Sequence, residues 1–575
     1  MTNVMRLRKG GFSQDSGKRR RADGGMTCEI GVDRWAFQPT YVHELCLCNS
    51  LSTIIKARQL ASRAHPLTTN GESMKSTIRR SFALGGAWVA AVTMSAALLV
   101  ACGAVPHAPA ARATMSNNQE IFRFIEDITA FGLRRSGTES SIKTTDYIAA
   151  KFKEFGLQKV TIRKGDTLQW DAQTWGLKVA GTTIPSFYMR HSFSTGGEGK
   201  FSTGPGGLNA EFVYVGDLKD LSGIDVKGKF VVADVVLSNL DLAKYTGAAK
   251  LVYDPDKTLF GETRLDPFSP NNFPFNFASA VEGGAVGFIG ILSNYFESNQ
   301  FYNEDVGYLV DDDFMLSLPG LWVNHRDGAV LKKILTQTPN ATGKLVLEGE
   351  TKTVQYRTVI GHLPGKTAET LMVQSHHDSG FMGAVEDASG VAEVLALAKY
   401  YGSQPAGTRQ RGMMFAVMDT HFTDYAAHDD IALNYIVRGG IDVVANVTVE
   451  HVAREMVVKN GQQVMTGQVD PRLFLTSPSL LDLMSEKVKK HDFRRSVVVS
   501  TELFTADSGL PTDVGTIHRH LHFPVISILS APAYLYDAVD TLDKVAQDQL
   551  QPTAILAADL LDSLDTIPRD KLGRD

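Results

Sequence analysis

Residues 353–565 alternate short apolar segments with segments of helical periodicity, and this alternation constrains the fold more than any other feature. The segments run LMVQSH, VAEVLALAKYY, RGMMFAVMD, IALNYIVR and VVANVTVEH. Strands with so little polar alternation are typical of a largely parallel sheet covered on both faces by helices. The predicted fold class is therefore α/β, with a mostly parallel sheet. Ligand sites in such sheets lie at the C-terminal ends of the strands.

Polar side chains gather at three of these predicted strand or helix ends. In chain order they are His376, His377, Asp378, Glu386, Asp387, Glu450 and His451. Imidazoles combined with carboxylates suit zinc or a similar divalent ion. Taken singly, an acid before a helix is commonly a partner of the helix dipole, and a histidine at a strand end is usually solvated. Their joint order favours a metal site.

The segments before residue 353 predict two further parts. Residues 118–169 show helical spacing in two blocks and then an extended run, QKVTI, which indicates helix, loop, helix and strand. Residues 170–352 contain short β-rich runs such as FVYVG and AVGFIGIL between turn residues. We expect residues 170–352 to form a β-rich domain inserted between two parts of one α/β domain, 118–169 and 353–565.

The N-terminal region has the pattern of an export signal. Residues 74–102 have a basic start and a mostly apolar stretch that ends in Leu-Val-Ala-Cys, which resembles a bacterial lipobox with Cys102 as the lipidated residue. A plain transmembrane anchor is the alternative, since about 20 apolar residues can span a bilayer. Both interpretations export the rest of the chain, and the first makes it a lipoprotein of the cell membrane that faces outward.

The flanking segments and the composition limit which partners and metal ligands the chain can have. Residues 1–73 are polar and without periodicity, so we expect a non-native or disordered extension, while residues 103–117, rich in Ala and Pro, predict a flexible tether. The net charge of -5 gives no basic surplus for nucleic acid. All four cysteines, of which Cys102 is the last, precede the tether, so any metal beyond it must be held by His and carboxylates.

Several segments together resemble the co-catalytic zinc aminopeptidase family, which includes glutamate carboxypeptidases. They are AFGLRRSGTESS, QSHHDSG with EDASGVAEV, and FPVISILSAPAYLYDAVDTLDKV. The insert resembles a protease-associated domain in DVKGKFVVADV, EGGAVGFIGIL and LPGLWVNHRDGAVLKKIL. The resemblance covers most of the chain after residue 118. It implies a zinc exopeptidase fold, zinc as cofactor and a peptide-like substrate.

The resemblance assigns ligands for one metal. His376 falls on the family's first histidine ligand, Asp378 on the carboxylate that orients it, and Glu386 on the bridging aspartate, with Asp387 beside it. Glu450 falls on the remaining carboxylate of that metal. The Asp-to-Glu changes at the bridging and remaining positions keep the charge, so a first metal site survives in outline.

The second metal site departs from the family. His421 stands where the general base glutamate belongs, Phe422 where a carboxylate ligand belongs, and Tyr536 where the closing histidine belongs. Phenylalanine cannot ligate, and tyrosine is an uncommon zinc ligand. One zinc is therefore the expectation, with two left open. His518, His520 and His522, predicted on one face of an extended segment, are an alternative source of ligands.

Three functions follow from this pattern. The first is a single-zinc hydrolase of peptide or N-acyl amino acid amide bonds, in which His421 replaces the glutamate as base. The second is a catalytically inactive relative that binds a peptide or a cell-envelope ligand, which Phe422 and Tyr536 favour. The third is acyl transfer by one zinc, as in glutaminyl cyclases, whose members usually lack a large insert.

Overall fold

The computed structural model describes residues 114–574, apart from residues 195, 241, 304–309, 311–313, 406 and 505–509. The predicted export signal with Cys102, the extension 1–73 and residues 103–113 of the predicted tether lie outside these residues. Within the described part, no helix is both long enough and apolar enough to cross a membrane.

The first described elements match the predicted order of helix, loop, helix and strand. Helix α2 (Asn118–Thr129) begins where the Asn117 side chain accepts a hydrogen bond from the Glu120 amide, and α3 (Glu139–Glu154) is capped in the same way by Thr138. Such caps satisfy amides that have no partner within the helix. Gly156, at a φ of 83°, ends this block before β1 (Gln158–Val179).

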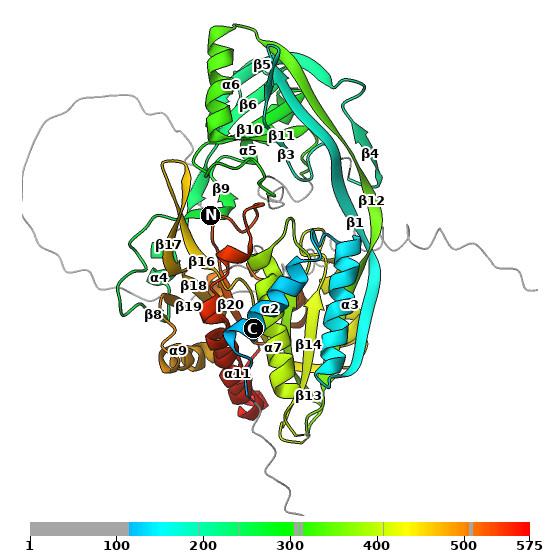
Figure 1. Cartoon of the computed structure of the whole chain (residues 1–575), viewed down its shortest axis with the longest axis vertical. Helices are drawn as coiled ribbons and strands as arrows, with labels where there is room; N and C mark the ends of the chain where they lie inside the picture. Colours follow the sequence, from blue (N-terminus) through cyan, green and yellow to red (C-terminus); the bar gives the residue numbers. More distant parts are fainter. Residues whose placement is uncertain are drawn as a thin grey trace, which may run out of the picture. The chain divides into compact units, whose positions relative to one another are not determined.

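A core sheet fills the lower part of Figure 1. Its central strands are parallel and run in the order β14, β13, β15 and β20, while β12 on one side and β18 on the other are antiparallel to them. The strands are β12 (Thr342–Leu363), β13 (Glu369–His376), β14 (Gly412–Met418), β15 (Asp442–Val449), β18 (Arg472–Thr476), β19 (Ser496–Ser500) and β20 (Val525–Ser530). The largely parallel α/β sheet predicted from the apolar segments is confirmed.

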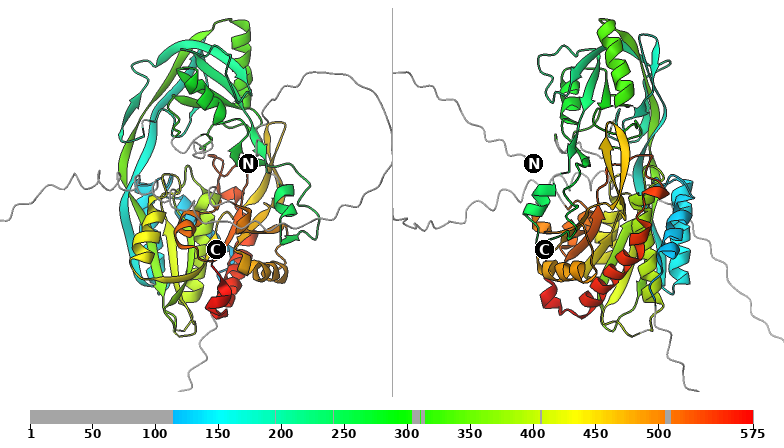
Figure 2. Two further views of the ribbon diagram at one scale, coloured as in Figure 1. Left: turned by 180° about the vertical axis from the view of Figure 1, so that it is seen from behind. Right: turned by 60° about the vertical axis from the view of Figure 1, so that its left-hand side comes forward.

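Both faces of the core sheet are buried, which explains why its strands lack polar alternation. On one face Leu371 and Val373 of β13 pack in a large core with α2, α7 (Gly390–Gly402) and α11 (Leu550–Thr566). On the other face Met372 packs in a separate cluster with Ile436 and with Ile517 of α10 (Gly515–Leu521). Figure 2 shows α2 and α3, in blue, along one side of this sheet. The remaining elements of this part are α8 (Ala426–Asp429), β16 (Arg454–Lys459), β17 (Gln462–Val469), α9 (Leu481–Lys490) and α12 (Arg569–Leu572).

A long two-stranded ribbon connects the core to the insert. Strands β1 and β12 pair antiparallel along almost their whole length, from Gln158 with His362 to Val179 with Gly343. The predicted boundaries of the insert, at residues 170 and 352, fall inside these two strands. The ribbon therefore belongs to both parts, as Figure 1 shows.

The insert has a small sheet of its own, in the order β3, β11, β10, β6 and β5. Strands β5, β6, β10 and β11 are parallel to one another, whereas β3 is antiparallel to β11. Its elements are β2 (Thr182–Ile184), β3 (Phe187–Tyr188), β4 (Gly199–Ser202), β5 (Leu208–Gly216), β6 (Phe230–Val235), β7 (Leu237–Asn239), α4 (Leu242–Gly247), β8 (Leu251–Tyr253), β9 (Leu265–Pro270), α5 (Phe275–Glu282), β10 (Gly287–Leu292), β11 (Gly320–Asn324) and α6 (His325–Gln337). Its relation to protease-associated domains stays a prediction.

One segment of the insert joins the core. Strand β8 pairs antiparallel with β19 and so extends the core sheet at that edge. Arg264, at the end of the segment that carries α4 and β8, forms a buried ion pair with Glu455 of β16, and Arg495 pairs with the same carboxylate. We call residues 242–265 the arm. Its contacts with the core place it beside the C-terminal ends of the parallel strands.

The extended conformation predicted for His518, His520 and His522 is wrong. Residues 515–521 form helix α10, and His522 follows it in the left-handed region at a φ of 51°. Ile517 is buried in the second core cluster, and its burial fixes the face that the helix turns to the sheet. His520 instead pairs with Asp429 at 2.8 Å, at a partly exposed position.

Candidate metal centre

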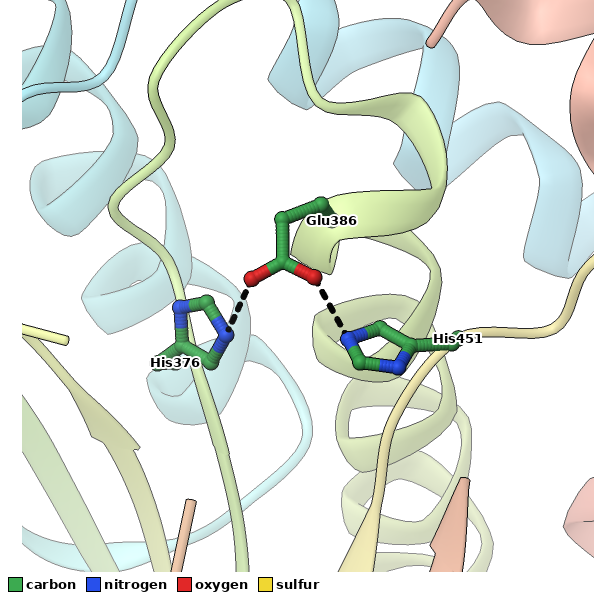
Figure 3. Close-up of side chains that lie close together, drawn as sticks. All are labelled: His376, Glu386 and His451. Atoms are coloured by element: carbon green, nitrogen blue, oxygen red, sulfur yellow. Dashed lines mark ion pairs between the residues drawn. The ribbon is translucent and has the colours of Figure 1, made fainter. Parts of the chain in front are cut away.

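His376, Glu386 and His451 bring one ligand atom each to a common point. These atoms all lie within 4.8 Å of one another, and all three residues are buried. Glu386 Oε1 lies 3.2 Å from His376 Nε2, and Glu386 Oε2 lies 2.6 Å from His451 Nε2. Figure 3 shows the carboxylate between the two imidazoles. The structure therefore brings together His376 and Glu386, two of the residues predicted as metal ligands.

None of the four inward-facing atoms makes a hydrogen bond within the described residues. His376 Nε2, His451 Nε2 and both Glu386 oxygens are buried without a hydrogen-bond partner, although they lie so close together. Buried polar atoms without a partner are costly and call for an explanation. A divalent cation between them removes this cost, and two imidazoles with one carboxylate match a catalytic zinc site.

The second nitrogen of each imidazole is held by the protein. His451 Nδ1 contacts the Ser530 carbonyl oxygen at 2.7 Å, and His376 Nδ1 contacts the Asp378 carbonyl oxygen at 3.1 Å and its carboxylate at 3.4 Å. A proton on Nδ1 that is donated to oxygen leaves the lone pair on Nε2, which is the arrangement of a ligating histidine. The predicted orienting role of Asp378 agrees with this geometry.

The loop that carries Glu386 is held by two buried charged side chains. The Arg134 guanidinium donates to the carbonyl oxygens of His377, Met382 and Gly383, and the Asp540 carboxylate accepts from the Glu386 amide at 2.9 Å. Burial lowers the pKa of Arg134 to about 10 and raises that of Asp540 to about 7. Both residues lie in segments that carry the family resemblance, but the sequence predicted no role for either, because each contacts backbone atoms more than 150 positions away.

Asp387 and Glu450, both predicted near the metal, are engaged elsewhere. Asp387 accepts hydrogen bonds from Ser375 Oγ and from the amides of Gly390 and His451. Glu450 Oε1 accepts from Thr512 Oγ1 and from the Asp513 amide. Neither carboxylate belongs to the converging group. Asp387 instead positions the backbone of His451.

His451 takes the place that the sequence assigned to Glu450. The chain leaves β15 at Val449, and His451 adopts a left-handed backbone at a φ of 55°, which turns its ring into the site. Histidine is among the residues that adopt this conformation more often than most. The sequence VTVEH contains both side chains, but the turn that decides between them has no local signature.

His421 lies over the site with its ring stacked on that of His376, at a centroid distance of 4.0 Å and an angle of 8°. Its Nε2 lies 3.8 Å from Glu386 Oε1, and its Nδ1 lies 3.7 Å from Asp513 Oδ1. Burial opposes protonation, as does the neighbouring His376, but the carboxylates of Asp513 and Glu386 prevail and raise the pKa of His421. The predicted base is therefore within reach of the metal centre.

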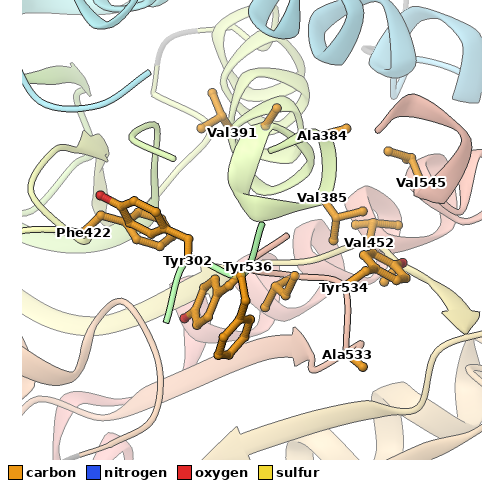
Figure 4. Packing of buried hydrophobic residues seen from close by; sticks show 14 of the residues in the cluster. Tyr302, Ala384, Val385, Val391, Phe422, Val452, Ala533, Tyr534, Tyr536 and Val545 are labelled. Atoms are coloured by element: carbon orange, nitrogen blue, oxygen red, sulfur yellow. The ribbon is translucent and has the colours of Figure 1, made fainter. Parts of the chain in front are cut away.

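Aromatic rings fill the place where the resemblance puts a second metal. Phe422 and Tyr536 pack edge to face at 5.4 Å, and Tyr302 of the insert packs on Phe422 at 5.6 Å. Figure 4 shows these rings together. The gap that they line next to Glu386 has about 0 Å³ of space for water. Aromatic pairs of this kind stabilise the packing by about 0.5–1.5 kcal/mol each.

A cavity of about 710 Å³ opens beside the metal centre. Its lining includes His421 and His451 from the core, and Leu242, Tyr245 and Phe268 from the insert. A volume of this size is typical of a small-molecule or peptide site. The arm thus forms part of the wall of the candidate substrate site.

Comparison with known proteins identifies the fold. Residues 358–420, which contain His376 and Glu386, match peptidase family M28. The zinc aminopeptidase BSAP from Bacillus subtilis is similar over 80% of this chain and 98% of its own, with 14% identity and a TM-score of 0.56. A peptidase M28 precursor from Shewanella amazonensis is similar over 78% and 93%, with 15% identity and a TM-score of 0.56.

The remaining comparisons contribute less to the identification of the fold. A glutaminyl cyclase from Porphyromonas gingivalis is similar over 78% of this chain and 99% of its own at 11% identity, but its TM-score of 0.36 supports no argument. A search of curated proteins finds no sequence that matches this chain. The chain therefore has the fold of zinc aminopeptidases, as its sequence motifs predict.

Proposed function

We propose that this chain is an exported, zinc-dependent hydrolase that cleaves an amide bond in a peptide or an N-acyl amino acid. The observation that carries the proposal is the convergence of buried ligand atoms of His376, Glu386 and His451 beside a cavity of about 710 Å³ whose lining includes His451. Those three residues would hold one zinc ion. Phe422 and Tyr536, in the packed aromatic cluster, support one ion rather than two.

The residues of the site have different roles in the proposed reaction. Bound zinc supplies a Lewis acid that polarises a carbonyl group and lowers the pKa of a water molecule. His421 Nε2, directed towards Glu386, takes the proton of the attacking water and returns it to the leaving amine. The Asp378 carboxylate keeps His376 oriented and also accepts from the Phe422 amide at 2.9 Å, which fixes the turn that carries His421.

Export and membrane attachment belong to the same proposal and rest on the sequence. The lipobox that ends at Cys102 supports an outward-facing lipoprotein of the cell membrane, which would confine the substrate to that side of the membrane. Incorporation of radiolabelled palmitate into the chain, and its loss in Cys102→Ala, tests the anchor. Unchanged labelling of Cys102→Ala would contradict it.

Replacing His421 by glutamine is expected to lower kcat by at least about 10²-fold, because a positioned base contributes that much or more. Zinc content should stay the same, since His376, Glu386 and His451 remain. The measurement is hydrolysis of a panel of aminoacyl p-nitroanilides and N-acyl amino acids by the zinc-loaded chain, with a chelator-treated sample beside it. The matched control is His362→Gln, which alters a half-buried histidine that contacts Tyr435 outside the site.

Two results would contradict the proposed function. If His421→Gln hydrolyses the substrates as fast as the unaltered chain, His421 is not the base. If the zinc-loaded chain hydrolyses no member of the panel but binds peptides in a calorimetric titration, the chain is a binding protein with a peptidase fold.

A further inference from the structure

The Asp513 carboxylate lies between two imidazoles. Asp513 Oδ1 contacts His428 Nε2 at 2.6 Å and lies 3.7 Å from His421 Nδ1. Asp513 and His428 are completely buried, and His421 is one-tenth exposed. The three side chains form a row that begins in the core and ends at the metal centre.

Separate elements hold this carboxylate in place. Gln374 of β13 donates from Nε2 to Asp513 Oδ2 at 3.0 Å, and the Asp513 amide donates to Glu450 Oε1 at 3.2 Å. His428 belongs to α8, where its amide donates to the Tyr425 carbonyl oxygen. The row is therefore built on the ends of β13 and β15 and on a helix, which gives it little freedom to move.

The donor and acceptor atoms of the row follow from the chemistry of the groups. Asp513 Oδ2 takes the Gln374 amide proton, so Oδ1 is the oxygen that both imidazoles face. A carboxylate oxygen has two lone pairs and can accept from both rings. If His421 donates from Nδ1, its Nε2 carries the lone pair, and that lone pair faces Glu386 Oε1 at 3.8 Å.

We propose that Asp513 and His428 are positioning residues for His421: His428 fixes Asp513, and Asp513 holds His421 in the tautomer whose Nε2 can accept a proton at the metal centre. The inference rests on the proposed role of His421 as the base. At 3.7 Å, His421 Nδ1 is outside hydrogen-bond distance of Asp513 Oδ1 in this structure, and the proposed role requires the two groups to approach. Hydrogen bonds between catalytic groups are commonly long without substrate and shorten when it binds.

The alternative is that the pair of Asp513 and His428 only ties α8 to the segment before α10. If the pair is only a structural tie, the tautomer of His421 does not depend on it. Under that alternative, removing the charge of Asp513 would change the melting temperature but not the tautomer of His421. The two interpretations therefore differ in a spectroscopic property that does not depend on turnover.

The test uses the full zinc-loaded chain with ¹⁵N-labelled histidine. We expect a protonated Nδ1 at His421, assigned by its loss in His421→Gln, and a shift of this proton to Nε2 in Asp513→Asn. An unchanged tautomer in Asp513→Asn overturns the inference. Because this spectrum needs no substrate, it decides the positioning role even if the proposed hydrolysis fails.

Kinetic measurements provide a second, independent test. Asp513→Asn should lower kcat by about 10²–10⁴-fold with KM within about twofold, as expected when a base is held in the wrong tautomer. His428→Phe should lower kcat by about 10-fold, and His428→Gln should restore most of that loss, because its amide can donate to Asp513 as Nε2 does. Zinc content should stay constant in all three variants. Equal kcat values in His428→Phe and the unaltered chain would overturn the role of His428.

Discussion

Replacing His451 by alanine is expected to weaken zinc binding by more than about 100-fold and to abolish hydrolysis. Alteration of a residue that only supports a ligand costs about 10–100-fold in metal affinity, so removal of a ligand should cost more. The imidazole of His451 is one of three converging groups, and its Nε2 lies 2.6 Å from Glu386 Oε2. Competition with a chromogenic chelator measures the affinity.

Glu450→Gln is the matched control, because it alters the neighbouring residue that the family resemblance of the sequence predicts as a metal ligand. Its Oε1 accepts from Thr512 Oγ1 and from the Asp513 amide, and a glutamine oxygen can keep both bonds. We expect this variant to bind zinc within about tenfold of the unaltered chain, the lower end of what a supporting residue contributes. Zinc binding that survives in His451→Ala but is lost in Glu450→Gln would show that Glu450 is the ligand.

The second large effect concerns stability. Glu455→Ala is expected to destabilise the fold by about 3–5 kcal/mol, because it leaves uncompensated charge in the interior. Glu455 Oε1 accepts from Arg264 Nε at 2.6 Å and from Arg495, and its Oε2 accepts from Thr466 Oγ1 at 2.6 Å. Exposure of the two ion-paired side chains Arg264 and Glu455 is only 3% and 2%. Chemical denaturation followed by circular dichroism measures the change.

Glu297→Ala provides the comparison for that variant. Glu297 pairs with His325 and Arg326 at 3.2 and 3.1 Å, but Arg326 is 71% exposed. Exposed ion pairs contribute about 0–1 kcal/mol. Equal destabilisation by the two substitutions would show that burial does not increase the contribution of the Glu455 ion pairs to stability. Faster proteolysis of the arm in Glu455→Ala alone would localise the effect, since Arg264 ends that segment.

Much of the core could be predicted because its signals are local. Strand β13 is buried on both faces, which explains the consecutive apolar residues Leu371, Met372 and Val373. His376 ends the first of these strands, and Glu386 stands just before α7. Topology brings the ends of parallel strands to one edge of the sheet, so the strand-end position of His376 was sufficient to place it in a site.

Other features depend on contacts between distant segments. The antiparallel pairing of β8 with β19 joins residues that are almost 250 positions apart, and three-residue strands carry little sequence signal. Tyr302 reaches the aromatic cluster from the insert, so the packing around Phe422 could not be predicted from the core alone. The exchange of Glu450 for His451 depends on one left-handed residue.

The most direct test of the central claim is the metal content of the purified chain by elemental analysis, without chelators, for the unaltered protein and for His376→Ala. The geometry of His376, Glu386 and His451, with the aromatic cluster in place of a second site, predicts about one zinc per chain and its loss in the variant. Two zinc ions per chain would contradict the role of Phe422 and Tyr536. No bound zinc after incubation with the metal would contradict the hydrolase itself.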